Sequence, residues 1–278
     1  MSIIIDRFVS EFIKRTSEFR GKGRIVSYWM QHRDTNAKRV RILPGGNPIV
    51  CDLASSYDCM VWLAREEQED LEILRHLLKP GQVFLDCGAN IGIWSLVAAS
   101  IVENAGKVYA FEPNPKTFQR FSENIALGQL TRNIQSFCLA VGNENTTLPF
   151  KCNDQHNISQ IVDESASDQV ISVPIVTIDS VLKETSVHGM KIDVEGFELE
   201  ALKGSEAIIR RDQPWLCVEF NTLLAGVTNL KSWPVHQYLM DLGYVARQFN
   251  DALNLDQASI LAETWETKGY LNLFYSIK

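Results

Sequence analysis

Apolar residues recur at every third or fourth position at the start of the chain. Five of them carry this spacing, with charged residues between them: Ile5, Phe8, Val9, Phe12 and Phe19. The spacing is that of an amphipathic helix. It predicts a helix that packs its apolar face against the protein, with a second copy of the chain or a membrane surface as the alternative partner.

Short apolar runs alternate with helical periodicity over the rest of the chain. Residues 24–51 hold alternating stretches and a PGGNP turn, which predict a hairpin or a meander. Helices are expected over 66–78, where a Lys-Pro-Gly sequence follows, over 94–102 and over 118–127. Strands are expected at 83–85, 108–111, 134–141, 190–194, 215–220, 244–248 and 271–276.

This order of elements predicts an α/β fold with one main sheet. Continuous apolar strands that alternate with helices are typical of a mostly parallel sheet covered on both faces. The last two strands are candidates for an antiparallel pair at one edge. We therefore divide the chain into an N-terminal extension of helix and short strands, residues 1–65, and a main domain, residues 66–278.

Charge and cysteine usage narrow the classes of function. The formal net charge is -7 at pH 7, which disfavours a sequence-independent grip on nucleic acid. The six cysteines form no CxxC pair and are expected to stay reduced. The N-terminus lacks the pattern of a signal peptide, and the longest apolar run, Ile93 to Val102, is shorter than the ~20 residues that span a bilayer. We expect a cytoplasmic protein with no membrane span, and a homodimer if a second copy covers the apolar stripe.

The turn after the first strand of the main domain carries the first candidate chemistry. It reads DCGANIG over residues 86–92, between a strand and a helix. Glycines at Gly88 and Gly92 let the backbone pass close to a ligand, as nucleotide-like cofactors require. A nicotinamide dinucleotide would use GxGxxG, but the third glycine is missing and Asp86 would repel a pyrophosphate. Asp86 can instead help orient the amino acid part of S-adenosylmethionine.

Glu112 ends the second strand of the main domain. Its carboxylate can accept hydrogen bonds from both hydroxyls of a ribose, which suits either cofactor. Asp86 is therefore the residue that distinguishes a nicotinamide dinucleotide from S-adenosylmethionine, and the spacing favours the methyl donor. A structural glycine turn with solvated carboxylates is the remaining alternative.

A set of motifs resembles a known family. These are KPG with VFLDCGANIGIWSL, then VYAFEPNP, LAVG, TIDSVL and MKIDVEGFELEALKG, in this order along residues 67–221. In order and spacing they resemble the FkbM-type methyltransferases. The resemblance implies a Rossmann-like class I methyltransferase sheet of seven strands and S-adenosylmethionine as cofactor. It also implies O-methylation, often of sugars or other secondary metabolites.

The resemblance further implies which residues bind the cofactor. Four residues match the glycine motif of the family: Asp86, Gly88, Asn90 and Gly92. Its ribose-binding and adenine-binding segments match at Glu112, Pro113, Ala140 and Val141. Glu67 matches a glutamate found before the first strand, although Gln68 stands where a proline is common. We assign Asp193 to the cofactor as well as to catalysis.

Methyl transfer to an alcohol needs a group that removes the hydroxyl proton. An alcohol is a weak nucleophile, so a base or a metal must draw off this proton as the new bond forms. Asp193 and Glu195 follow a strand at its carboxyl end, where open α/β sheets place their sites, and each is a candidate base. His156, in a polar loop between strands, is a third candidate.

A magnesium site is the alternative source of activation. The candidate ligands lie at the ends of neighbouring strands and offer the oxygen atoms that Mg2+ prefers: Asp193, Glu219 and Asn221. The competing interpretations are structural. Glu219 would pair with Lys191 or Arg210. Asp193 would cap the helix that begins near Phe197.

The sequence as a whole predicts an S-adenosylmethionine-dependent O-methyltransferase that acts on a hydroxyl of a sugar, glycan or small metabolite. Acceptor contacts are expected from the N-terminal region, the 150–170 loop and the 222–236 segment. Two alternatives of other classes stay open. These are an NAD-type oxidoreductase and a cofactor-binding protein without turnover.

Overall fold

The fold is built on one large mixed sheet. The computed structural model describes residues 3–16, 19–64, 68–152, 160–161, 170–227, 230–249, 255–257 and 269–278. The described strands of this sheet lie in the order β13-β12-β14-β11-β10-β3-β4-β5. Its parallel part consists of β3 (Val83–Cys87), β4 (Lys107–Phe111), β5 (Ile134–Phe137), β10 (Gly189–Ile192) and β11 (Trp215–Asn221). The predicted α/β class with a mostly parallel sheet is confirmed.

An antiparallel edge completes the sheet, as the sequence predicted. It consists of β12 (Tyr244–Phe249), β13 (Leu255–Gln257) and β14 (Tyr270–Ile277). Strand β14 is antiparallel to both β11 and β12. The class I methyltransferase sheet was expected with seven strands, and the short β13 adds an eighth beside β12.

Helices cover both faces of the sheet. One core packs under α4 (Gln68–Leu77), α5 (Ile93–Val102) and α6 (Pro115–Leu127). The other packs under α7 (Ile178–Leu182), α8 (Glu198–Lys203), α9 (Glu206–Asp212) and α11 (Pro234–Asp241). Successive side chains of a strand point to opposite faces, so Phe84 belongs to the first core and Leu85 to the second.

A second, smaller sheet was not predicted. It has the order β6-β9-β7-β8 and consists of β6 (Ala140–Val141), β7 (Thr146–Lys151), β8 (Gln160–Ile161) and β9 (Val170–Val176). The single strand predicted over 134–141 is therefore wrong, because β5 and β6 belong to different sheets. The chain leaves the main sheet after Phe137, and Ala140 pairs with Ile175 of β9. Both strands are short and mostly apolar, so the bend between them leaves no mark in the hydrophobic pattern.

The N-terminal helix packs on a mixed face of polar and apolar residues, so the sequence prediction is right for one part of the apolar stripe and wrong for the other. Helix α1 (Ile3–Arg15) buries Asp6, Ser10 and Ile13 and packs Val9 and Phe12 against the core, while Phe8 is 72% exposed. Asp6 accepts a hydrogen bond of 3.0 Å from Trp29 Nε1 and pairs with Arg39. Polar groups without partners are costly inside a protein, so these bonds set the orientation of the helix.

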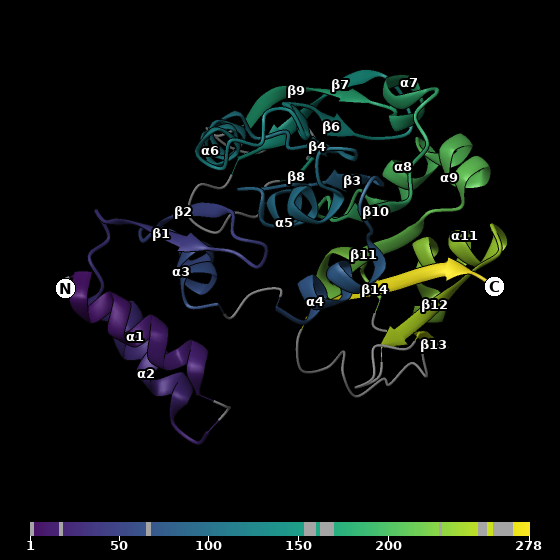
Figure 1. The fold of residues 1–278 in the computed structure, drawn as a ribbon. Helices are drawn as coiled ribbons and strands as arrows, with labels where there is room; N and C mark the ends of the chain where they lie inside the picture. The colour runs from purple at the N-terminus through teal and green to yellow at the C-terminus, as the bar shows by residue number, and fades with distance from the viewer. Residues whose placement is uncertain are drawn as a thin grey trace.

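The remainder of the N-terminal region is part helix and part hairpin. Helix α2 (Lys22–His32) lies beside α1 at one end of the molecule, far from the antiparallel edge (Figure 1). The predicted hairpin is formed by β1 (Lys38–Ile42) and β2 (Pro48–Asp52), which pair across the turn. The prediction of strand structure from residue 24 onward is wrong for residues 24–32, which belong to helix α2. The shorter helices are α3 (Ser56–Trp62), α10 (Thr222–Ala225) and the 3-10 helix η1 (Leu230–Ser232). Within the described ranges, every helix is too short or too polar to cross a membrane.

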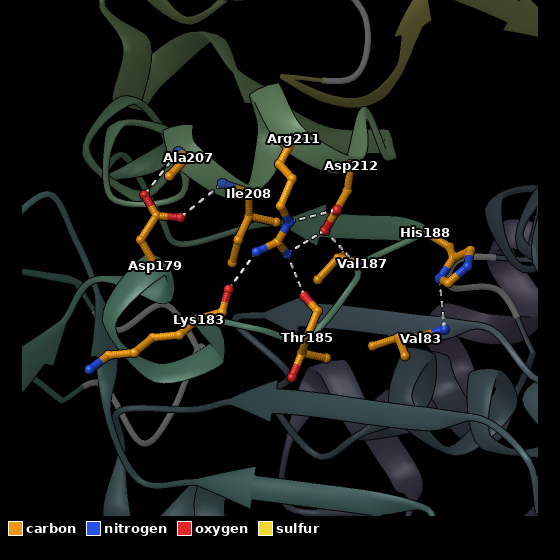
Figure 2. A network of polar contacts seen from close by, with 10 residues as sticks. All are labelled: Val83, Asp179, Lys183, Thr185, Val187, His188, Ala207, Ile208, Arg211 and Asp212. Carbon is orange, nitrogen blue, oxygen red and sulfur yellow. Dashed lines mark hydrogen bonds and ion pairs between the residues drawn. The ribbon is translucent and has the colours of Figure 1, made fainter.

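Polar contacts connect helices α7 and α9 and the starts of β3 and β10 (Figure 2). Asp212 accepts a hydrogen bond of 2.8 Å from Val187 N and pairs with Arg211. The Val83 N–H donates to His188 Nδ1 at 3.2 Å, which joins the starts of β3 and β10. Asp179 accepts from two backbone N–H groups of α9. Each of these polar groups has its partner within the chain, so the contacts are structural.

Candidate functional site

A cleft of about 710 Å3 opens at the carboxyl ends of the parallel strands. Volumes of this order are typical of sites for cofactors and small molecules. Most of the predicted site residues line it: Gly88, Asn90, Glu112, Pro113, Ala140, Val141, Asp193, Glu195, Glu219 and Asn221. Residues at the ends of four strands of the main sheet (β3, β4, β10 and β11) meet here because the ends of parallel strands share one edge of the sheet, and Ala140 and Val141 of β6 join them from the second sheet. Glu67 and His156 lie outside the described residues.

The glycine turn between β3 and α5 is shaped by contacts within the chain. Gly88 and Gly92 both have positive φ angles, of 83° and 98°. A Cβ on Gly88 would overlap the carbonyl oxygen of Asp193, and one on Gly92 would overlap the Phe121 ring. Close approaches within the protein therefore already require these glycines, in addition to the approach of a ligand expected from the sequence. Gly92 does not line the cleft.

Asp86 lies behind the turn. Its side chain is fully buried and its Oδ2 accepts a hydrogen bond of 2.6 Å from Ser95 Oγ. Burial raises the pKa of this carboxyl, and the nearby Lys191 ammonium opposes the rise. Because Asp86 is not among the cleft-lining residues, its contribution to a ligand is through the turn that it supports.

Glu112 presents its carboxylate at the end of β4. The backbone N–H of Asn90 donates to Oε2 at 3.0 Å, and that of Asn114 donates to Oε1 at 2.8 Å. Burial raises the pKa of Glu112 to about 7. Each carboxylate oxygen can accept a further bond, and the buried Oδ1 of Asn90 has no hydrogen-bond partner among the described residues. This arrangement fits a pair of adjacent hydroxyls, such as those of a ribose.

Lys191 is a site residue that the sequence analysis treated only as an ion-pair partner. Its side chain is 4% exposed and its Nζ lies 2.7 Å from Asp193 Oδ2. It also lies over the ring of Trp94, another cleft-lining residue, 5.7 Å from the centroid. The signal was present in the sequence, because a lysine inside an apolar strand must find a counter-charge nearby.

The backbone loses its strand conformation shortly after the end of β10. Strand β10 ends at Ile192, two residues before the predicted end, and Glu195 and Gly196 have φ angles of 53° and 94°. Glu198 Oε1 holds this loop by accepting from Val194 N at 3.2 Å and Gly196 N at 2.9 Å. The loop aims Glu195 into the cleft independently of strand alternation.

The two candidate bases have different surroundings. Asp193 is held in its ion pair with Lys191, and the N-cap residue of α8, Phe197, makes no side-chain cap. The alternative role of Asp193 as a helix cap is therefore wrong. Burial raises the pKa of Glu195 to about 7, and the neighbouring carboxylates of Asp193 and Glu198 add to the rise. A carboxylate with this pKa is well matched to proton removal near neutral pH.

Two of the three predicted magnesium ligands, Asn221 and Asp193, are engaged elsewhere. Asn221 Oδ1 caps α10 by accepting from Leu223 N and Leu224 N at 3.2 and 3.4 Å. The ammonium of Lys191 already neutralises Asp193. In the part of the chain that the structure describes, no group of three or more His, Cys, Asp or Glu side chains is placed to hold a metal ion. The magnesium prediction is not supported.

Glu219 forms neither of the ion pairs expected from the sequence. Lys191 pairs with Asp193, and Arg210 Nε donates to Glu206 at 2.7 Å. Burial raises the pKa of Glu219, and the carboxylate of Asp193 adds to this rise. Its Oε2 is buried without a hydrogen-bond partner among the described residues. Glu219 is thus a half-buried acceptor at the edge of the cleft.

Sequence comparisons identify relatives of this chain. A sequence model of the Methyltransferase FkbM domain matches residues 86–245. Hexuronic acid methyltransferase AglP of Haloferax volcanii is 29% identical over 153 residues, which cover 52% of this chain and 59% of that protein. A tRNA (guanine(37)-N(1))-methyltransferase of Phytophthora infestans is 33% identical over 84 residues, covering 30% of this chain and 20% of that protein. The chain thus matches less than two thirds of the length of either relative.

A solved structure also aligns with part of this chain. The Methyltransferase FkbM of Methylobacillus flagellatus KT aligns with 78% of this chain and 54% of its own, with a TM-score of 0.45 and 15% identity. The sequence match of the FkbM domain begins at Asp86 and extends to Val245, from the glycine turn into β12. This match covers more than half of the chain, and the chain therefore belongs to the FkbM methyltransferase family.

Proposed function

We propose that this protein is an S-adenosylmethionine-dependent O-methyltransferase that acts on a hydroxyl of a sugar, glycan or small metabolite. The observation that carries the proposal is the placement of Glu112 and Glu195 in one cleft. Glu112 suits a ribose, and Glu195 has the pKa of a base that works near neutral pH. The family and the name of the Haloferax relative support it. Membership in a methyltransferase family argues against the NAD-type oxidoreductase.

The residues present fit the cofactor at one end of the cleft. Glu112 would accept from the ribose hydroxyls, and Ala140 and Val141 would lie against the adenine. Asn90 and the backbone beside Gly88 would face the amino acid part. When bound, S-adenosylmethionine supplies a methyl group on a positively charged sulfur. Glu112 and Asp193 follow β4 and β10, which flank β3, so they lie about 10 Å apart along the sheet edge.

We assign the role of base to Glu195. Its carboxylate would accept the proton of the acceptor hydroxyl as the oxygen forms its new bond. Asp193 is held by Lys191 at 2.7 Å, so its negative charge is fixed and compensated. This makes Asp193 a positioning and electrostatic group next to the base. The turn at Gly196 allows the loop to present Glu195 at this place.

Methyl transfer by Glu195→Gln tests the proposal. The expected result is a fall in kcat of about 100-fold or more on any acceptor that the wild type methylates, with binding of S-adenosylhomocysteine unchanged. The wild-type rate should rise with pH and level off above about 7, and Glu195→Gln should lose this rise. Glu200→Gln, on the neighbouring helix α8 but outside the cleft lining, is the matched control. Equal rates for Glu195→Gln and wild type would remove Glu195 from catalysis. Cofactor binding without transfer to any hydroxyl would favour a binding protein without turnover.

A further inference from the structure

The charge of the cleft restricts its acceptor. The described residues that line it include six acids: Glu69, Asp70, Glu112, Asp193, Glu195 and Glu219. The same described lining has one lysine and no arginine, and this lysine, Lys191, is already paired with Asp193. An acceptor that carries a carboxylate or phosphate would bring a further negative charge among groups that already repel one another.

Two hydrogen-bond acceptors lie side by side at the end of the cleft away from Glu112. Glu219 of β11 and Asn272 of β14 are directly opposite each other in the antiparallel ladder. Both line the cleft, and Glu219 Oε2 and Asn272 Oδ1 have no hydrogen-bond partner among the described residues. Asn272 Nδ2 donates to Asp70 Oδ2 at 2.8 Å, which fixes the amide so that its oxygen remains available. Such a pair requires a ligand that donates hydrogen bonds.

An unsatisfied donor faces the same cleft. Trp94 is 2% exposed, lines the cleft, and its Nε1–H has no hydrogen-bond partner in the described part of the chain. An indole N–H only donates, so it requires an acceptor atom. A carboxylate would satisfy this donor but not Glu219, and an ammonium would satisfy Glu219 but not the donor. A hydroxyl group donates and accepts at once, and a sugar carries several of them.

The position of this pair suits the acceptor of the transfer. Ile192, the last residue of β10, lies opposite Val218 of β11. The next residues along these two neighbouring strands, Asp193 and Glu219, are therefore at the same level of the sheet. Glu219 therefore lies on the base side of the cleft, about three strand spacings or ~14 Å from Glu112 along the sheet. The cofactor residues and this pair occupy opposite ends of one cavity.

We infer that the acceptor is a neutral polyhydroxyl compound, a sugar without an acid group, and that Glu219, Asn272 and Trp94 bind its hydroxyls. This rests on the proposed function. The inferred acceptor therefore differs from the hexuronic acid in the name of the Haloferax relative. The selectivity comes from the absence of an unpaired cation in the described lining together with the mixed set of unsatisfied donors and acceptors.

The test compares matched sugars. Radiolabelled methyl transfer would be measured with the methyl glycosides of glucose, galactose, mannose and rhamnose and with those of glucuronic and galacturonic acid. We expect kcat/KM to be at least tenfold higher for one or more of the neutral glycosides than for either uronide. Glu219→Gln and Asn272→Ala should raise KM for the preferred glycoside at least fivefold, and Glu219→Gln should narrow the preference over the uronides.

The controls distinguish a failure of this inference from a failure of the proposed function. Glu72→Gln removes the same charge from an exposed residue of α4 outside the cleft lining, and KM should stay within twofold of wild type. S-adenosylhomocysteine should bind every variant within twofold of wild type. A preference for uronides, no transfer to any glycoside despite cofactor binding, or equal effects of Glu72→Gln and Glu219→Gln would overturn the inference alone. Absence of cofactor binding would overturn the proposed function and the inference with it.

Discussion

The ammonium of Lys191 lies 2.7 Å from the Oδ2 of Asp193, at the point where β10 enters the cleft. The lysine is almost fully buried, whereas Asp193 is 24% exposed. Asp86 lies close enough for its pKa to respond to the same lysine. One buried cation therefore connects the glycine turn after β3 with the loop that carries the candidate base.

Removal of this cation should destabilise the protein. We expect Lys191→Met to lower the free energy of unfolding by about 2 kcal/mol, because it leaves a partly buried carboxylate without its counter-charge. The double variant Lys191→Met/Asp193→Asn should recover about half of this loss. Urea denaturation measures both. Lys203→Met, which removes an exposed pair with Glu200 at 3.9 Å, is the control and should change stability by less than about 0.5 kcal/mol. Equal effects of the two single variants would contradict the structural role of Lys191.

The stability of the protein without ligand should decrease as pH rises. Burial raises the pKa of Glu112, Glu195 and Glu198 to about 7 in the folded state, from about 4.5 in the unfolded state. Between these values the folded chain holds more protons, so its stability falls from about pH 4.5 to pH 7 and is level above. Thermal unfolding at pH 5.5 and pH 8 should show this decrease, and Glu198→Gln should reduce it. A melting temperature that increases from pH 5.5 to pH 8 would exclude the raised pKa values.

Gly88 should be far less tolerant of a side chain than other glycines with positive φ. Gly88→Ala would place a Cβ against the backbone of Asp193, which cannot move away without breaking the contact between β3 and β10. Gly46 also has a positive φ but has open space at its Cβ position, so Gly46→Ala should cost only about 1 kcal/mol of backbone strain. We expect Gly88→Ala to lose several times as much in a denaturation experiment. If the two variants are equally stable, the close approach of Gly88 to Asp193 is not a constraint on the fold.

The buried Asp6 of α1 should matter more for stability than the exposed Phe8 of the same helix. Asp6→Ala should cost about 3 kcal/mol, because Asp6 is fully buried against Trp29 and Arg39. Phe8→Ser should cost less than about 0.5 kcal/mol, because Phe8 is exposed. The reverse order would show that Phe8, and not Asp6, packs against the protein. Light scattering of Phe8→Ser also tests the homodimer proposed from this stripe, since a dimeric wild type should become monomeric and an unchanged mass would contradict it.

The sequence predicted the elements around the cleft because their sequence patterns are local and strong. Strand β3, the glycine turn and α5 form a continuous apolar run interrupted only by small residues, and Glu112 follows the next strand directly. The division between β5 and β6 could not be predicted, since it depends on the pairing of Ala140 with a strand about 35 residues later, which no local period records.

Partners of buried polar groups were the least predictable part of the site. Asp193 was a candidate metal ligand and helix cap, but its partner is Lys191, two residues away in the same motif. The α1 prediction was wrong for Phe8 for a related reason, because the buried bonds of Asp6 to Trp29 and Arg39 turn the helix so that Phe8 is exposed. Asn272 was missed because its role depends on lying opposite Glu219 in the folded sheet.

The cofactor class is tested most directly by calorimetric titration of the full chain with S-adenosylhomocysteine. We expect saturable binding to the wild type and at least a tenfold weaker affinity for Glu112→Gln, since the carboxylate that we propose for the ribose loses its charge. Glu123→Gln, on helix α6, should bind like the wild type. A parallel titration with a reduced nicotinamide dinucleotide should show no binding. Saturable binding of the dinucleotide with none of S-adenosylhomocysteine would contradict the assignment of this cleft to a methyl donor.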